Sequence, residues 1–137
     1  MHAARTIFAA PVALALAAIS FVVTPALADS NDLAGSWSGG GSVVYNTGSK
    51  EKARCRASIN KAGTGAYAMS ATCATASGKV VQATTLRKTG SSNYSGRYRN
   101  TEYNVEGTIR VSQNGNSISV MTTTDNGAVG SFSMRRQ

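Results

Sequence analysis

The sequence predicts an all-β protein, an eight-stranded antiparallel up-and-down barrel (a meander) that carries one disulfide. Three observations predict this fold. After residue 28 there is no proline, and apolar residues recur at every second position, as in strands with one buried face. Turns rich in glycine and asparagine separate these alternating segments. The two cysteines of the chain lie on either side of one such turn.

The first 28 residues are interpreted separately from the barrel. Arg5 precedes an apolar run, and Ala26 and Ala28 fit the pattern at which secretory signal peptides are cleaved. Pro11 interrupts the apolar run, which argues against a membrane anchor. We therefore expect a signal peptide over residues 1–28, an exported protein that is periplasmic or secreted, and no transmembrane segment after cleavage.

The remaining chain is long enough for one domain. We place a flexible N-terminal segment at residues 29–34 and the β-barrel domain at residues 35–137. The expected strands are 35–46, 50–61, 66–76, 79–88, 92–99, 102–113, 116–124 and 128–136. Eight consecutive antiparallel strands favour a closed barrel, because closure removes both exposed edges. A two-sheet sandwich built from the same hairpins is the alternative.

The hairpin that contains both cysteines predicts a disulfide. With a three-residue turn at 63–65, Cys55 lies directly opposite Cys73, and one face of the hairpin is apolar while the other is polar. Opposed positions of this kind are within disulfide reach, and export would supply an oxidising compartment. We therefore expect a disulfide between Cys55 and Cys73 that joins the second and third strands.

Side chains that carry out catalysis are scarce. The only histidine, His2, lies in the predicted signal peptide, and bonded cysteines offer no thiolate. The sequence has no phosphate-binding loop, nucleophile elbow or zinc-ligand spacing. Glu102 and Glu106 lie near Arg99, which indicates cross-strand ion pairing more than a catalytic carboxylate pair. We expect no enzyme activity, no cofactor and no metal site.

The charge balance favours anionic partners. The formal net charge is +8, and it falls to +7 when Arg5 is removed with the signal peptide. Arg54 and Arg56 face outward, and guanidinium groups suit carboxylates and phosphates. Their neighbours, including Ser42 and Thr72, are small, so a partner can approach closely.

The leading hypothesis is therefore a non-enzymatic exported binding protein. Its basic outer face would recognise an anionic glycan, a lipid phosphate or a protein in the cell envelope. No nucleic acid is expected, because no exposed aromatic platform is evident. The alternatives for this face are a purely solubilising surface and the interface of a homodimer.

The barrel interior offers a second hypothesis, a carrier of small molecules. Trp37, Tyr45, Gln82 and Tyr98 are expected to point inward and would line an interior pocket. The alternative is a packed core, because an eight-stranded barrel is just wide enough for side chains to fill.

Part of the sequence resembles a known family. The residues that carry the resemblance are Leu33-Ala34-Gly35-Ser36-Trp37, Cys55-Arg56, Ala62-Gly63, Ala66-Tyr67-Ala68 and Cys73. They resemble the bacterial inhibitors of secreted alkaline metalloproteinases and the outer-membrane lipoproteins that share their fold. The resemblance implies a small exported eight-stranded barrel with one disulfide. It also implies a third hypothesis, proteinase inhibition through the segment before the first strand. The residues carried over are Asp29, Ser30, Asn31, Asp32 and Leu33.

Overall fold

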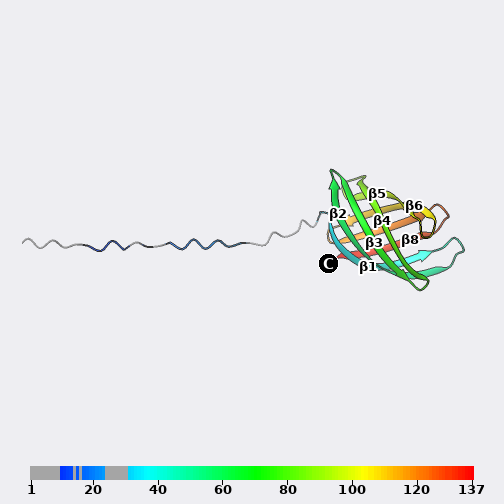
Figure 1. The fold of residues 1–137 in the computed structure, drawn as a ribbon, viewed down its shortest axis with the longest axis horizontal. Coiled ribbons are helices and arrows are strands. Elements are labelled where there is room, and N and C mark those ends of the chain that lie inside the picture. Colours follow the sequence, from blue (N-terminus) through cyan, green and yellow to red (C-terminus); the bar gives the residue numbers. More distant parts are fainter. Residues whose placement is uncertain (1–9, 14, 16, 24–30) are drawn as a thin grey trace, which may run out of the picture.

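The computed structural model describes residues 10–13, 15, 17–23 and 31–137. Within these residues the chain forms eight strands (Figure 1). They are β1 (Gly35–Val44), β2 (Lys50–Gly63), β3 (Ala66–Thr75), β4 (Gly78–Lys88), β5 (Asn93–Asn100), β6 (Val105–Asn114), β7 (Ser117–Thr124) and β8 (Val129–Arg136). No helix in this described part is long and apolar enough to cross a membrane. The predicted cleavage point after Ala28 lies outside the described residues, so the signal peptide stays a prediction.

The sheet closes on itself. Each strand pairs antiparallel with the next, and β8 pairs with β1. Gly39 and Gly41 of β1 let β8 approach closely, because a side chain at either position would clash with the backbone of β8. A Cβ atom at Gly39 would lie 2.0 Å from the carbonyl oxygen of Ser133, and a Cβ atom at Gly41 would lie 1.8 Å from that of Ser131. The predicted eight-stranded up-and-down barrel is confirmed, and the alternative of a two-sheet sandwich is wrong.

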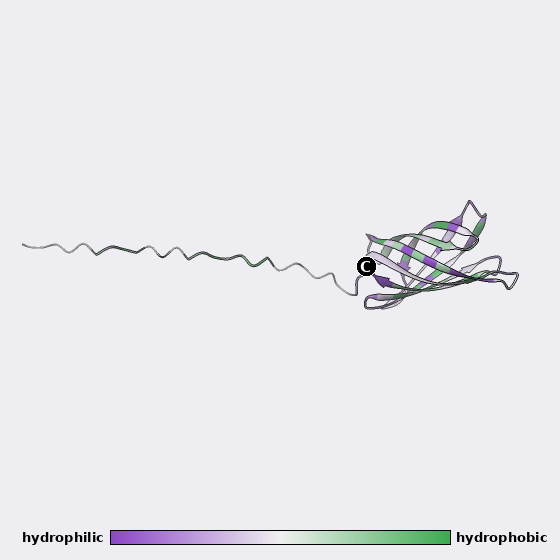
Figure 2. Ribbon diagram, turned by 90° about the horizontal axis from the view of Figure 1, so that it is seen from below, coloured by the Kyte–Doolittle hydropathy of each residue, from purple (hydrophilic) through white to green (hydrophobic). Residues whose placement is uncertain are grey.

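Two hairpins have the predicted register. Cys55 pairs with Cys73 in the β2–β3 ladder, the two Cα atoms are 4.1 Å apart, and the disulfide is formed. In the β7–β8 ladder, Val120 pairs with Phe132. Alternate residues of β2 are exposed and buried, and Figure 2 shows hydrophilic and hydrophobic segments alternating along the strands. The period-two pattern therefore assigned these side chains to the correct face.

The other hairpins differ from the expected register because their turns have other lengths. In the β1–β2 ladder, Val43 pairs with Glu51, two residues from the expected partner Ala53. In the β5–β6 ladder, Tyr98 pairs with Gly107, and the expected partner Tyr103 lies in the connecting loop. Each register is displaced by an even number of residues, so each side chain of the paired strands keeps its predicted face.

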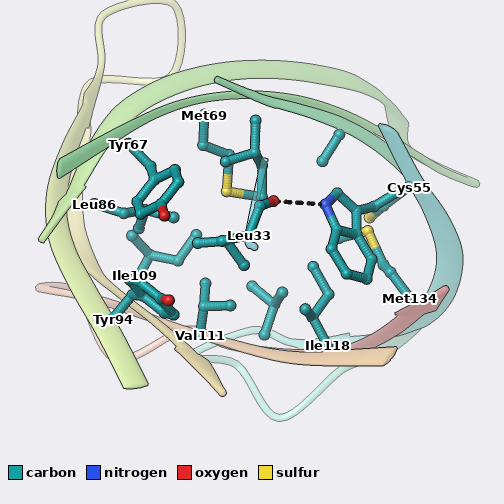
Figure 3. Packing of buried hydrophobic residues seen from close by; sticks show 14 of the residues in the cluster. Leu33, Cys55, Tyr67, Met69, Leu86, Tyr94, Ile109, Val111, Ile118 and Met134 are labelled. Atoms are coloured by element: carbon teal, nitrogen blue, oxygen red, sulfur yellow. Dashed lines mark hydrogen bonds between the residues drawn. The ribbon is translucent and has the colours of Figure 1, made fainter. Parts of the chain in front are cut away.

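Large apolar side chains fill one half of the barrel, which we call the filled half. Figure 3 shows its core from close by. The indole Nε1 of Trp37 donates a hydrogen bond to the Leu33 carbonyl oxygen, at 3.1 Å. The rings of Tyr67 and Tyr94 meet edge to face, with centroids 5.5 Å apart. Its buried members are Leu33, Trp37, Ala53, Cys55, Ala57, Ile59, Tyr67, Met69, Leu86, Tyr94, Ile109, Val111, Ile118, Val120 and Met134.

The residues just before β1 close this end of the barrel. Leu33 is fully buried. The guanidinium of Arg136 donates to the carbonyl oxygens of Ala34, at 2.7 Å, and of Asp32. The Gln113 amide also donates to the Asp32 carbonyl oxygen, at 3.2 Å. Side chains from β6 and β8 thus hold the entering chain across the barrel end.

This arrangement differs from the flexible segment expected at residues 29–34. Asp29 and Ser30 lie outside the described residues, and Asn31 is exposed. Asp32 and Leu33, however, are held in place, because Leu33 gains more from the apolar core than from water. A protease could engage the side chain of Leu33 only if Leu33 first left that core.

Candidate functional site

The half of the barrel away from Leu33 holds a cavity of about 440 Å³, and we call this the open half. The core residues nearest the open half form the cavity floor: Met69, Ile109, Val120 and Met134. The rim comes from the turns between strands: Tyr45, Ser77, Tyr103, Asn126 and Ala128. The walls comprise Val43, Ala71, Cys73, Thr75, Gly78, Val80, Gln82, Thr84, Tyr98, Asn100, Val105, Thr122, Thr124 and Phe132.

The open half is hollow because its inward side chains are small. Along β3 the inward positions pass from Tyr67 and Met69 in the core to Ala71 and Thr75 at the cavity. Along β7 they pass from Ile118 to Thr122 and Thr124, and along β4 from Leu86 to Thr84. An eight-stranded barrel needs large side chains to fill its interior. The decrease in size along the strands therefore leaves space that the filled half lacks.

The cavity wall carries no formal charge, because none of the residues that line it is acidic or basic. Val43, Val80, Val105 and Phe132 supply apolar surface on several sides. Threonine hydroxyls and the amides of Gln82 and Asn100 supply the polar groups. Such a lining suits an uncharged molecule, because a charged ligand would lose its hydration without gaining an ionic partner.

Two hydroxyl groups in the cavity have no hydrogen-bond partner within the described chain. The Tyr98 hydroxyl lies over Gly107, where a Cβ atom would be only 2.6 Å from it. The Thr122 hydroxyl lies over Gly130, where a Cβ atom would be 2.5 Å away. Burial, followed by the charge of Asp125, raises the pKa of Tyr98, so its hydroxyl stays protonated and able to donate.

One seam of the barrel wall is joined mainly by side chains. The β4–β5 ladder contains two residue pairs in the described chain, Arg87 with Ser95 and Lys88 with Tyr94. Beyond them, toward the cavity, Thr84 Oγ1 donates to the Arg97 carbonyl oxygen at 2.7 Å. Gln82 Nε2 donates to the Arg99 carbonyl oxygen at 3.2 Å. The wall is therefore less tightly paired at this seam than elsewhere.

A carboxylate ties two turns together at the cavity rim. The Tyr45 hydroxyl donates to Glu51 Oε2 at 2.8 Å, and the Ser77 hydroxyl donates to the other carboxylate oxygen. Hydrogen bonds from Ser77 and then Tyr45 lower the pKa of Glu51, and the bond to Glu51 raises the pKa of Tyr45. The negative charge at this rim adds to the case against an anionic ligand inside.

The predicted interior residues separate into two groups. Tyr45, Gln82 and Tyr98 line the cavity, as expected for a pocket. Trp37 does not: it is 1 % exposed and belongs to the core of the filled half. The prediction that Trp37 lines a pocket is wrong, because the chain before β1 covers this end of the barrel. The interior is a packed core in one half and a cavity in the other.

The predicted basic residues lie on the outer face of the first three strands. Arg54 and Arg56 are exposed, and Thr72 pairs with Arg56 across the β2–β3 ladder. Ser42 pairs with Lys52 across the β1–β2 ladder. The structure thus places these side chains on the predicted surface and adds Lys52 to it.

Two acidic side chains on the other side of the barrel form ion pairs. Arg99 lies 3.3 Å from Glu106, and Arg97 lies 3.1 Å from Asp125. The predicted cross-strand pairing of Glu106 with Arg99 is confirmed. For Glu102 the prediction is wrong: it lies in the turn between β5 and β6 and has no ion pair within the described residues. Among the residues that the structure describes, no three His, Cys, Asp or Glu side chains form a group that could hold a metal ion.

These features define a class of protein: a small up-and-down β-barrel with a core at one end and a ligand-sized cavity at the other. No protein-family model and no curated protein matches the sequence. Solved structures with the same fold include a redesigned β-barrel, mFAP1, bound to DFHBI. It is 10% identical, has a TM-score of 0.63, and the match covers 76% of this chain and 94% of that chain.

Two further solved structures are similar. One is a de novo designed fluorescence-activating β-barrel, at 13% identity and a TM-score of 0.58, with 76% of this chain and 93% of that chain covered. The other is a redesigned β-barrel, mFAP0, bound to DFHBI, at 13% identity and a TM-score of 0.61, with 76% and 98% covered. At such low identity these similarities establish the fold alone. Proteinase inhibition stays a prediction.

Sequence reasoning missed most of the cavity wall. Ala71, Thr122 and Thr124 line the space with small side chains, and each is unremarkable in the sequence by itself. The signal that could have found them is the fall in side-chain size along strands such as β3 and β7 from one end of the barrel to the other. The signal becomes visible only when the inward side chains are grouped by the end of the barrel at which they lie and their sizes are compared.

Proposed function

We propose that this protein binds a small, uncharged, mainly apolar molecule in the open half of the barrel and carries it without chemical change. The observation that supports the proposal is a cavity of about 440 Å³ next to a close-packed core in one small barrel. Ligand sites in proteins commonly range from roughly 300 to 1,000 Å³ and are mainly apolar with a few polar groups.

The polar groups of the cavity narrow the ligand class. The Tyr98 hydroxyl can donate to a carbonyl or ether oxygen, and Thr122 can donate or accept. The Gln82 amide nitrogen is engaged with backbone carbonyls, which leaves its oxygen to accept from a ligand. A mainly apolar molecule with one or two oxygen atoms would satisfy these groups.

The solved structures support the view that a barrel of this architecture can bind a ligand. The redesigned barrels mFAP1 and mFAP0 are each bound to DFHBI. The chain described here shares their fold and has its own cavity at one end of the barrel. A binding role needs only this cavity.

The test is titration of the protein with Nile red, an uncharged dye whose fluorescence rises in apolar surroundings. We expect saturable binding to the parent protein. Ala71→Phe places a ring in the cavity and is expected to abolish that binding. Ala74→Phe makes the same change on the outer face of the same strand and is the matched control.

Circular dichroism is used to check that both variants keep the β-sheet content of the parent. No saturable binding by the parent would overturn the proposal. Equal binding by Ala71→Phe and Ala74→Phe would overturn it as well, because the dye would then lie outside the cavity. The anionic dye anilinonaphthalene sulfonate is expected to bind more weakly than Nile red, since no cation lines the site.

A further inference from the structure

The outer face of β2 carries a row of cations that the cavity does not use. Lys50, Lys52, Arg54 and Arg56 occupy four consecutive outward positions, and all four are exposed. None of them forms an ion pair within the described chain. Outward residues on one strand are separated by about 6.6 Å, so the row extends for about 20 Å.

The acidic side chain nearest in sequence does not neutralise this row. Glu51 lies on the opposite face of β2, where its carboxylate accepts hydrogen bonds from Tyr45 and Ser77. The far side of the barrel is different, because Arg97 and Arg99 are paired with carboxylates there. The four cations of the row therefore carry positive charge that no acidic side chain of the described residues neutralises.

The positions that flank Lys52, Arg54 and Arg56 are small, whereas Val44 lies beside Lys50. Ser38, Gly40 and Ser42 of β1 pair with Arg56, Arg54 and Lys52 on one side. Thr72 and Ala74 of β3 pair with Arg56 and Arg54 on the other side. These neighbours leave the cationic groups open to a partner, and the hydroxyl groups can hydrogen-bond to it.

We propose that this cationic row binds a linear acidic polysaccharide, whose chain lies along β2. A row of evenly spaced cations complements a chain with regularly repeated anionic groups. Arginine guanidinium groups bind carboxylate and sulfate oxygens in a bidentate manner, and the flanking serine and threonine hydroxyls can contact sugar hydroxyls.

The same face fits other polyanions less well. Single-stranded nucleic acid is usually bound with aromatic side chains on which bases stack, and the flanking positions offer none. Membrane-surface binding combines cations with large apolar side chains that enter the lipid. The positions beside Lys52, Arg54 and Arg56 are serine, glycine, threonine and alanine, and the large apolar neighbour in these ladders is Val44, which pairs with Lys50 at the end of the row. The observations therefore favour an acidic polysaccharide over both.

The test is binding of the full chain to sodium polygalacturonate, a linear polysaccharide with a carboxylate on each sugar. We expect Arg54→Gln/Arg56→Gln to reduce the affinity by about tenfold or more, because two charge-assisted contacts are lost. The matched control is Arg87→Gln/Arg110→Gln, which removes the same charge from exposed positions on β4 and β6. The control is expected to stay within about twofold of the parent, and salt near 0.5 M to weaken binding by the parent.

The outcomes separate the proposal from its rivals and from ligand binding in the cavity. No binding of polygalacturonate by the parent, or an equal loss in both double variants, would overturn it. Single-stranded DNA and phosphatidylglycerol vesicles are tested in parallel, and tighter binding of either, with the same loss in Arg54→Gln/Arg56→Gln, would also overturn it. Nile red binding by that variant is expected to match the parent, since both side chains lie outside the cavity.

Discussion

The two halves of the barrel are made by the same eight strands, yet they differ in what their inward side chains do. In the filled half, Leu33, Trp37, Ile59 and Leu86 are almost completely removed from water. In the open half, Val43 and Phe132 remain partly accessible around the cavity. Close packing and the cavity are thus separated along the barrel axis. The filled half supplies the close packing that stabilises the fold, and the open half gives up such packing for space.

The largest difference between the halves is expected for truncation of large aromatic residues. Trp37→Ala would remove a buried ring and its hydrogen bond to Leu33, and we expect the free energy of unfolding to fall by about 3–5 kcal/mol. Phe132→Ala, at the cavity, should cost only about 1 kcal/mol, because its ring is partly accessible before the change. Chemical denaturation of both variants measures this. Equal losses would show that the halves are equally important for stability.

The disulfide lies where the two halves meet, so its removal measures how much this link contributes to the stability of the barrel. Cys55 is buried in the core, whereas Cys73 lines the cavity. The cysteines are separated by 18 positions, and closing a loop of this size stabilises a protein by about 3 kcal/mol. We expect Cys55→Ala/Cys73→Ala to lose about this much stability in chemical denaturation. The reduced parent protein should behave like the variant; a reduced parent as stable as the oxidised one would contradict the expectation.

Alkaline pH is expected to weaken the filled half. Burial, followed by the charge of Asp32, raises the pKa of Tyr67 and Tyr94 above the ordinary value of 10.0. Because the folded state holds these protons more tightly, their contribution to stability is complete below about pH 10 and is lost as the pH rises through the folded pKa values. Denaturation curves on either side of about pH 10 measure the loss.

Tyr94→Phe provides the control for this pH effect. The variant lacks one of the two ionisable phenols, so its free energy of unfolding should fall less steeply with rising pH than that of the parent. An identical pH dependence in the two proteins would exclude Tyr94 as a source of the effect.

The smallest effect on stability, and a specific effect on binding, is expected for Tyr98→Phe. The Tyr98 hydroxyl has no partner within the described chain, so its loss should change the free energy of unfolding by less than about 0.5 kcal/mol. The affinity for Nile red, which has a carbonyl oxygen, should fall by about threefold to tenfold, the worth of one hydrogen bond. Tyr94→Phe, in the filled half, should leave that affinity unchanged. Unchanged binding by Tyr98→Phe would remove this hydroxyl from the site.

Most of the fold could be predicted from the sequence, because period-two alternation and turn residues are local properties. Turn length displaced the register of several hairpins, as at Val43 and Tyr98, without moving any strand side chain to the other face. The register of the disulfide hairpin could be predicted, since it was fixed by both faces of the ribbon together.

The site could be predicted only in part. Tyr45, Gln82 and Tyr98 were assigned to the interior by alternation, but alternation does not say at which end the interior is full. Which end is full depends on the combined size of the inward side chains that all eight strands contribute at each height along the barrel axis. It also depends on Leu33, whose burial beside Trp37 follows from the path of the chain before β1 and not from any repeat in the sequence.

The most direct test of a barrel divided into a filled half and an open half is a proton–nitrogen correlation spectrum recorded during titration with Nile red. Signals from the cavity wall, such as the backbone amides of Ala71, Tyr98 and Val105, are expected to shift and then saturate together. The indole signal of Trp37 should stay in place, because this group is buried in the filled half and bonded to Leu33. A shift of the Trp37 indole as large as those at the cavity wall, or no saturating shifts at the wall, would contradict the account.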